Sequence, residues 1–209
     1  MNISWRGQSF FEIQTPEAKV IIDPYDASIG LKPPKTEADV VLITHNHPDH
    51  ANIKSVSGSP FIIDSLGEYE IKGVFVKGIL GFHDKDNKEP LIIYNLESGG
   101  IKMCHLSDLG QKELTDEQIE AIGEVDILMI PVGGTYTVDA KAAKDIVSQI
   151  EPRVVIPMHY KIPKLKVKLD GVESFLKQMG AEKTETEKKF KVSQKNLPVE
   201  ETKVVVLEP

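Results

Sequence analysis

Three histidines and one aspartate lie within a single heptapeptide, THNHPDH, which spans residues 44–50. The chain of 209 residues has only six histidines, so half of them lie in this one segment. Imidazole nitrogens and carboxylate oxygens are ligands that Zn²⁺ and similar divalent ions prefer. Crowding such groups together is unfavourable unless a cation lies between them. The segment therefore predicts a metal site that includes His45, His47, Asp49 and His50.

The spacing of these ligands indicates more than one metal ion. In a turn that leaves a strand, His45 and His47 can face one side while Asp49 and His50 face another. Each pair lacks further ligands, which other segments must supply. Two ions about 3.5–4 Å apart can hold a hydroxide between them and stabilise both the attacked and the leaving oxygen. The alternative is a solvated loop without metal, but an apolar strand that ends in HxHxDH disfavours it.

The elements that must position these ligands change in type along the chain. Short apolar or alternating runs, separated by Gly, Pro, Asn and Asp, predict strands in the first part of the chain. Helical spacing and capping residues predict helices further on. The predicted strands cover residues 2–7, 9–14, 18–23, 38–45, 59–64, 73–79, 90–97, 100–107, 125–132, 153–159, 189–194 and 202–209. The predicted helices lie within residues 115–123, 137–152 and 171–180. This order is typical of a layered α/β protein with sheet at its centre.

Polar residues follow the predicted strands at the points where the strands end. Asp23 follows KVII, Thr44 follows VVLI, His105 follows IKMC and His159 follows VVIPM. Strand ends that feed loops at one rim are where such folds collect their functional sites. We therefore expect these residues to lie near the histidine-rich segment.

Composition limits the class of protein. Hydrophobic residues make up 40% and charged residues 27%, which suits one globular domain over residues 1–209. The net charge of −7 argues against nucleic acid and anionic membranes as partners. The single cysteine, Cys104, excludes an internal disulfide and fits a reducing compartment. The first residues resemble neither a signal peptide nor a membrane anchor, so a cytoplasmic location is predicted.

The chain resembles the metallo-β-lactamase superfamily, whose HxHxDH signature is matched by His45, His47, Asp49 and His50. The segments SWRGQSFFEI, KVIIDPY and VVIPMHY extend this resemblance over most of the chain. CHLSDLG, DILMIPVGGTYTVDA and VVIPMHYK resemble the small single-domain branch related to ascorbate-6-phosphate lactonase. The resemblance implies a four-layer αβ/βα sandwich with a two-metal cleft along one sheet edge.

The resemblance also implies how the ligands are shared. One ion would be held by His45, His47 and a third histidine. The other would be held by Asp49, His50 and His159, with Asp108 bridging the two. The third histidine is left open between two residues: the branch favours His83, and His105 lies closer in sequence to Asp108. If His83 is the third ligand, His105 would form a hydrogen bond with a ligand or with the substrate.

Asp23 matches an early aspartate of the superfamily that orients a ligand histidine. The alternative for Asp23 is an ordinary Asp-Pro turn, and the alternative for Asp108 is a turn aspartate. The chain departs from the pattern at two positions: Ser107 stands where the branch usually has glycine, and Gln8 where the opening motif often has histidine.

The implied chemistry is hydrolysis by a metal-bound hydroxide, with Asp49 and Asp108 as the catalytic carboxylates. The expected cofactors are two divalent ions, Zn²⁺ or Mn²⁺, with Ni²⁺ or Fe²⁺ also compatible. The expected substrate is a lactone, ester or phosphodiester of a small metabolite, either neutral or anionic. Cys104 is expected to be buried packing, because hydrolysis of this kind needs no thiol. The resemblance leaves a homo-oligomer open.

Residues beyond the ligands are candidates for substrate contact. Lys161 could anchor an anionic substrate, and Thr135 and Tyr136 lie in a glycine-rich turn at a helix start. Residues 161–170, KIPKLKVKLD, alternate lysines with apolar residues, which predicts an exposed edge strand or a flap.

Other functions of the same scaffold are alternatives. A di-iron oxidoreductase would usually have Glu at the position of Asp49 and a flavin domain. A nuclease would need a basic surface and an inserted domain, and this chain has neither. A metal-binding protein without turnover is a third alternative.

Overall fold

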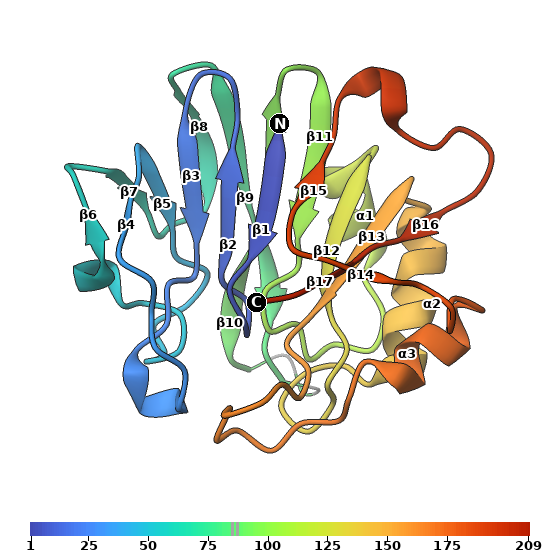
Figure 1. The fold of residues 1–209 in the computed structure, drawn as a ribbon. Coiled ribbons are helices and arrows are strands. Elements are labelled where there is room, and N and C mark those ends of the chain that lie inside the picture. The colour runs from blue at the N-terminus through green and yellow to red at the C-terminus, as the bar shows by residue number, and fades with distance from the viewer. Residues whose placement is uncertain (85, 87) are drawn as a thin grey trace.

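Two β-sheets pack face to face in the computed structural model, which describes residues 1–84, 86 and 88–209 (Figure 1). The first sheet is formed mainly by the N-terminal part of the chain, and β3, β5 and β7 run parallel within it. Its strand order is β15 (Phe190–Lys191), β1 (Asn2–Trp5), β2 (Phe11–Gln14), β3 (Lys19–Ile22), β5 (Val40–Leu42) and β7 (Phe61–Ile63).

The second sheet combines antiparallel strands with a parallel half. Its strand order is β16 (Lys203–Val204), β13 (Val154–Met158), β12 (Ile127–Pro131), β11 (Ile101–His105), β10 (Pro90–Ser98), β9 (Val74–Phe82) and β8 (Gly67–Ile71). Two short pairs complete the strands: β4 (Thr36–Glu37) with β6 (Val56–Ser57), and β14 (Thr186–Glu187) with β17 (Val206–Leu207).

The main core lies between the two sheets. Trp5 and Phe11 of the first sheet and Tyr94 of the second are fully buried in one apolar cluster. The hydroxyl of Tyr94 reaches the backbone carbonyl oxygens of Ile43 and Ile63, at 3.0 and 2.9 Å. A residue of the second sheet thus satisfies polar groups at the edge of the first, as a buried hydroxyl requires.

The outer faces of the sheets are covered differently. The helices α1 (Asp116–Ile122), α2 (Ala140–Ile150) and α3 (Glu173–Gln178) gather beside the second sheet (Figure 1). The first sheet is covered by loops and the short 3₁₀ helices η1 (Ala27–Ile29) and η2 (Ile53–Ser55), over an apolar cluster that includes Phe10 and Tyr25. A third 3₁₀ helix, η3, spans Gln194–Asn196. The predicted α/β sandwich is confirmed, with short 3₁₀ turns forming the layer outside the first sheet.

Local signals in the sequence account for the helix boundaries. Thr115 caps α1 through a capping box with Gln118, as predicted. Asp139 caps α2 by accepting a hydrogen bond from the backbone N–H of Ala142. The prediction of an edge strand over residues 161–170 was wrong, because this segment is an irregular loop between β13 and α3. None of the described helices is long and apolar enough to cross a membrane.

Candidate metal centre

The polar strand ends meet at one rim of the sandwich. β3 and β5 run parallel, so Asp23 and Thr44 leave the first sheet on the same side. In the second sheet β11, β12 and β13 run parallel, while β9 shares their direction because both β9 and β11 are antiparallel to β10. The segments that follow β9, β11 and β13 therefore emerge together, and carry His83, Asp108 and His159.

Seven side chains with metal-binding atoms form two neighbouring groups at this rim. Within each group, the potential ligand atoms all lie within 4.8 Å of one another. The first group consists of His45, His47 and His83, and the second of Asp49, His50, Asp108 and His159. The structure thus brings together the residues that the resemblance assigns to each ion, with Asp108 in the second group.

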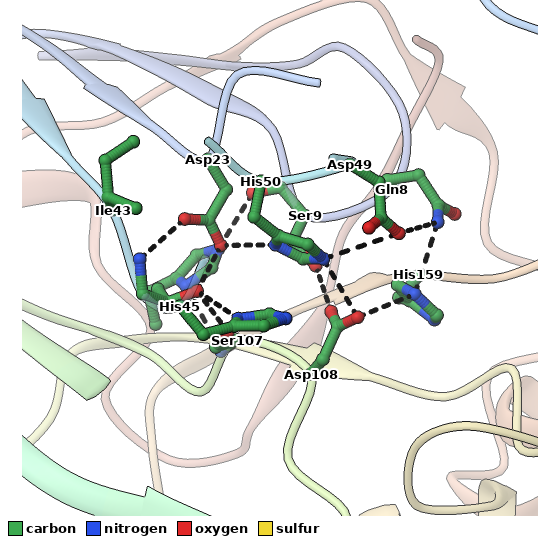
Figure 2. A network of polar contacts seen from close by, with 12 residues as sticks. Gln8, Ser9, Asp23, Ile43, His45, Asp49, His50, Ser107, Asp108 and His159 are labelled. Atoms are coloured by element: carbon green, nitrogen blue, oxygen red, sulfur yellow. Dashed lines mark hydrogen bonds and ion pairs between the residues drawn. The ribbon is translucent and has the colours of Figure 1, made fainter. Parts of the chain in front are cut away.

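Asp108 approaches imidazoles of both groups, and Figure 2 shows its carboxylate facing His50 and His159 of the second group. Its Oδ2 is 3.0 Å from Nε2 of His50 and 3.0 Å from Nε2 of His159. The same oxygen is 3.8 Å from Nε2 of His83, which belongs to the other group. A carboxylate in this position can contact ions on both sides, so the geometry suits the predicted bridging role.

His45 fits a metal ligand because its hydrogen bonds determine which nitrogen is free. The Thr44 hydroxyl donates to Oδ2 of Asp23 at 2.7 Å and accepts from the Ser107 hydroxyl at 2.6 Å. The remaining contact of Thr44, 2.9 Å from Nδ1 of His45, must therefore be donated by the imidazole. Nε2 of His45 is then left with a lone pair, is buried, and has no hydrogen-bond partner among the described residues. A buried acceptor of this kind is rare in proteins, and a divalent ion would satisfy it.

The electrostatics also favour a neutral His45. Burial, together with the neighbouring His50, lowers the pKa of His45 to about 3. The two rings lie 4.1 Å apart between centroids. His45 is therefore an uncharged imidazole at neutral pH, the form that binds metal ions.

His50 is held between two buried carboxylates. Its Nδ1 lies 2.8 Å from Oδ2 of Asp23, and its Nε2 lies 3.0 Å from Oδ2 of Asp108. Burial alone would lower the pKa of His50, but the charges of Asp108 and Asp23 raise it well above its usual value. Burial would likewise raise the pKa of Asp108, but His159 and His50 hold it well below its usual range. The cluster thus keeps its carboxylates ionised and ready to bind cations.

Gln8 contacts two of the candidate ligands. Its side-chain amide nitrogen lies 3.3 Å from Oδ2 of Asp49 and 3.3 Å from Nε2 of His159. Burial would raise the pKa of Asp49, but the hydrogen bond and charge of His50 lower it to about 2. The residue that departs from the superfamily pattern at position 8 therefore lies directly against the second group of ligands.

The loop after β9 brings His83 to the first group. Its backbone N–H donates to the carbonyl of Glu89 at 2.8 Å, which closes the loop at its base. A Cβ atom at Gly110 would overlap the carbonyl oxygen of His83, so only glycine allows this close approach. Glu89 also places Oε1 3.0 Å from Nε2 of His47. One loop therefore supplies an imidazole to the site and a carboxylate that holds another imidazole.

His105 lies behind the site rather than in it. It is fully buried, and its Nδ1 accepts a hydrogen bond from the backbone N–H of Ser107 at 3.2 Å. Its Nε2 faces the carbonyl oxygen of Ser9 at 3.0 Å. Burial lowers the pKa of His105. Both nitrogens are occupied by the backbone, so the geometry favours His83 as the third ligand of the first group.

Four residues at the site have left-handed backbone conformations. Gln8, Asp23, Ser107 and His159 have φ values of 50°, 49°, 56° and 50°. Such conformations are uncommon for residues other than glycine and cluster at functional sites. Glycine adopts such a φ without strain, whereas Ser107 at this position also donates a hydrogen bond from its hydroxyl to Thr44.

The candidate substrate residues are distributed unevenly around the site. A cavity of about 610 Å³ is lined by His47, Asp49, His83, Asp108 and His159, and also by Tyr136, Lys166 and Lys168. Lys161 and Thr135 are exposed and lie outside the residues that line this cavity. The roles predicted for Lys161 and Thr135 therefore gain no geometric support.

Some residues of the site were missed in the sequence. Ser9 and Glu89 contact candidate ligands, but hydroxyl and carboxylate groups in loops are too common to stand out by type. Thr44, by contrast, was expected near the site as a polar residue at a strand end, and it contacts His45.

Comparison with known proteins identifies the family to which the chain belongs. The family described as the Beta-lactamase superfamily domain matches residues 2–159. A protein of Thermococcus onnurineus named UPF0173 metal-dependent hydrolase is 27% identical over 190 residues, covering 77% of this chain and 84% of that protein. A protein of Archaeoglobus fulgidus with the same name is 26% identical over 199 residues, covering 77% and 83%.

A solved structure supports the same relationship at higher identity. It is a protein of Thermotoga maritima, described as a candidate Zn-dependent hydrolase of the metallo-β-lactamase superfamily. It is 38% identical with a TM-score of 0.83, and the match covers 99% of this chain and 98% of that one. The chain therefore belongs to the metallo-β-lactamase superfamily, among its metal-dependent hydrolases.

Proposed function

We propose that this hydrolase binds two divalent ions and cleaves a lactone, ester or phosphodiester of a small metabolite. The observation that carries the proposal is the position of Asp108, whose Oδ2 lies within 3.8 Å of imidazole nitrogens from both ligand groups. His45, His47 and His83 would hold one ion, and Asp49, His50 and His159 the other. The buried lone pair of His45 supports the same assignment.

Bound divalent ions would lower the pKa of water from about 15.7 toward about 7 and stabilise negative charge on the attacked group. The protein itself must position the attacking water and provide groups that transfer protons. Asp108, held at Oδ1 by the Ser9 hydroxyl at 2.6 Å, keeps Oδ2 toward both ligand groups and can orient the attacking water. Asp49, which is partly exposed to the cavity, is the second proposed catalytic carboxylate and can exchange protons with water in the cavity.

The identity of the ions belongs to the proposal. Imidazoles and carboxylates suit Zn²⁺ and Mn²⁺, and Ni²⁺ or Fe²⁺ also accept such ligands. We also propose a relationship to ascorbate-6-phosphate lactonases, which would make a lactone the substrate. On this proposal the partner is a small molecule and not a nucleic acid. A cytoplasmic location and a homo-oligomer remain predictions from sequence.

Metal analysis and a substrate panel test the proposal together. We expect the purified protein to contain up to two divalent transition-metal ions per chain and to hydrolyse at least one of a panel of lactones, carboxylic esters and phosphodiesters. Asp108→Ala should abolish turnover while circular dichroism shows a folded chain. Asp145→Asn, on the exposed surface of α2, is the matched control and should behave as wild type.

Other results would point to the competing functions. Two iron ions with oxygen-dependent turnover, and no hydrolysis, would favour an oxidoreductase. Cleavage of RNA with salt-dependent binding would favour a nuclease. Hydrolysis at wild-type rates in Asp108→Ala would remove the central role of this carboxylate.

A further inference from the structure

The loop between β13 and α3, residues 161–170, places lysines at the metal cavity. In Figure 1 this loop, coloured orange, runs along the lower edge of the molecule between β13 and α3. Lys166 and Lys168 line the cavity that also contains His47, Asp108 and His159. The candidate metal ligands and two lysine ammonium groups therefore line the same cavity.

The position of these lysines is fixed by the backbone of the loop. The N–H of Lys166 donates to the carbonyl of Ile29 in η1 at 2.8 Å, and the N–H of Lys161 donates to the carbonyl of Asp170 at 2.8 Å. Gly30, with φ of 95°, lets the loop approach, because a Cβ there would overlap the carbonyl oxygen of Lys164. Loop residues that are tied at several points hold their side chains at lower entropic cost.

The alternation in the sequence separates the two faces of the loop. Leu165 and Val167 pack on the apolar cluster outside the first sheet, and Leu169 is buried. Lys166 and Lys168 are exposed. Among the described residues, neither ammonium group forms an ion pair with a carboxylate, so both charges are free to meet an anion in the cavity, whereas lysines such as Lys72 and Lys102 are paired.

We infer that Lys166 and Lys168 form an anion subsite, and that the substrate carries a carboxylate or phosphate group separate from the bond that is hydrolysed. This inference rests on the proposed function and adds the substrate class. The protein as a whole has a net charge of −7, so a small anion needs a local positive potential to enter. Ammonium groups are compact charges that suit carboxylate and phosphate oxygens, and a cavity of about 610 Å³ suits a metabolite.

A matched pair of esters tests the subsite through activity. 4-Nitrophenyl hydrogen glutarate carries a free carboxylate, and 4-nitrophenyl valerate is an uncharged ester of the same chain length. In metal-loaded wild type we expect the charged ester to have the higher kcat/KM. In Lys166→Gln/Lys168→Gln this preference should fall by about tenfold, the size of one charge-assisted contact. The change should appear mainly in KM, because a distant anion contact binds substrate and transition state alike.

Calorimetric binding of glutarate provides a readout that needs no turnover. We expect glutarate to bind the double lysine variant about tenfold more weakly than wild type. Acetate has a single carboxylate, which the metal ions can hold alone, and should bind the variant and wild type equally. Lys164→Gln/Lys188→Gln removes the same charge outside the cavity and should leave glutarate binding unchanged. 4-Phosphonobutyrate has a phosphonate in place of one carboxylate of glutarate: lysine-dependent binding tighter than that of glutarate favours a phosphorylated substrate, and weaker binding favours a carboxylated one.

The two arms separate failure of the subsite from failure of hydrolysis. Unchanged glutarate binding in Lys166→Gln/Lys168→Gln, or an equal loss in the control variant, overturns the subsite. If glutarate binding depends on the lysines but neither ester is cleaved, the subsite stands and ester hydrolysis fails.

Discussion

The hydroxyl of Ser9 donates a hydrogen bond to Oδ1 of Asp108 at 2.6 Å, although the two residues lie 99 positions apart in the chain. Ser9 belongs to the turn between β1 and β2, and its carbonyl oxygen is held by His105. The first sheet thereby holds one oxygen of Asp108, which leaves the other facing both groups of candidate ligands.

Ser9→Ala should therefore disturb the site and the stability together. Both side chains are buried, so loss of the hydroxyl leaves a carboxylate oxygen without its donor, at about 1–3 kcal/mol of unfolding free energy. Urea denaturation of the metal-loaded protein measures this change. Ser4→Ala, at a buried serine outside the cluster, is the control. Equal unfolding free energies for Ser9→Ala and wild type would show that the hydrogen bond contributes nothing.

Asp23→Asn should weaken metal binding without disturbing the backbone. Asp23 accepts hydrogen bonds from Thr44 and faces Nδ1 of His50 at 2.8 Å. Its φ of 49° is one that asparagine adopts readily. Loss of a carboxylate that orients a ligand imidazole typically weakens metal affinity by about 10–100-fold. A competition titration with a chromogenic chelator measures the affinity, and wild-type affinity in the variant would contradict the orienting role.

Glu89 should orient His47 for metal binding in the first ligand group. Because Oε1 of Glu89 lies 3.0 Å from Nε2 of His47, it can hold the ring so that Nδ1 is free to bind an ion. We expect Glu89→Ala to weaken metal affinity by about tenfold or more. Glu89→Gln keeps an oxygen acceptor and should lose less. Glu68→Gln, on the distant strand β8, is the control. If Glu89→Ala and wild type have the same metal affinity in this titration, the contact between Glu89 and His47 has no role in metal binding.

Removal of the metal should lower the thermal stability. An ion that binds only the folded chain stabilises it by about 2.7 kcal/mol at a concentration 100-fold above its Kd. We expect a chelator to lower Tm and added Zn²⁺ or Mn²⁺ to restore it. In Asp108→Ala the restoration should be smaller, because both ligand groups lose their shared carboxylate. A Tm that is independent of metal in wild type would argue against binding at this site.

Cys104 should be unreactive in the folded protein. The thiol is fully buried in β11, and burial raises its pKa, so the reactive thiolate is scarce at neutral pH. We expect no reaction with Ellman's reagent until denaturant is added, when one thiol per chain should react. Treatment of the native protein with iodoacetamide should leave hydrolysis unchanged. Rapid inactivation would show that the thiol is accessible.

The sequence alone determined the superfamily and the layered α/β fold, and it predicted two groups of candidate ligands. Local patterns carry this information: His45, His47, Asp49 and His50 lie in one segment, and the capping box at Thr115 and Gln118 needs only neighbouring residues. Alternation and strand punctuation are also local, so strands such as β5 and β13 could be predicted.

The tertiary structure decided the contacts that join distant segments. Whether His83 or His105 reaches the first group depends on the direction of β9 relative to β11, and no local pattern encodes it. The sequence of residues 161–170 looks like an edge strand because lysines alternate with apolar residues. The apolar residues instead pack on a cluster beside η1, and the lysines Lys166 and Lys168 turn to the cavity. Alternation of lysine and apolar residues shows that a segment has two different faces. Only the tertiary packing determines which part of the protein each face contacts.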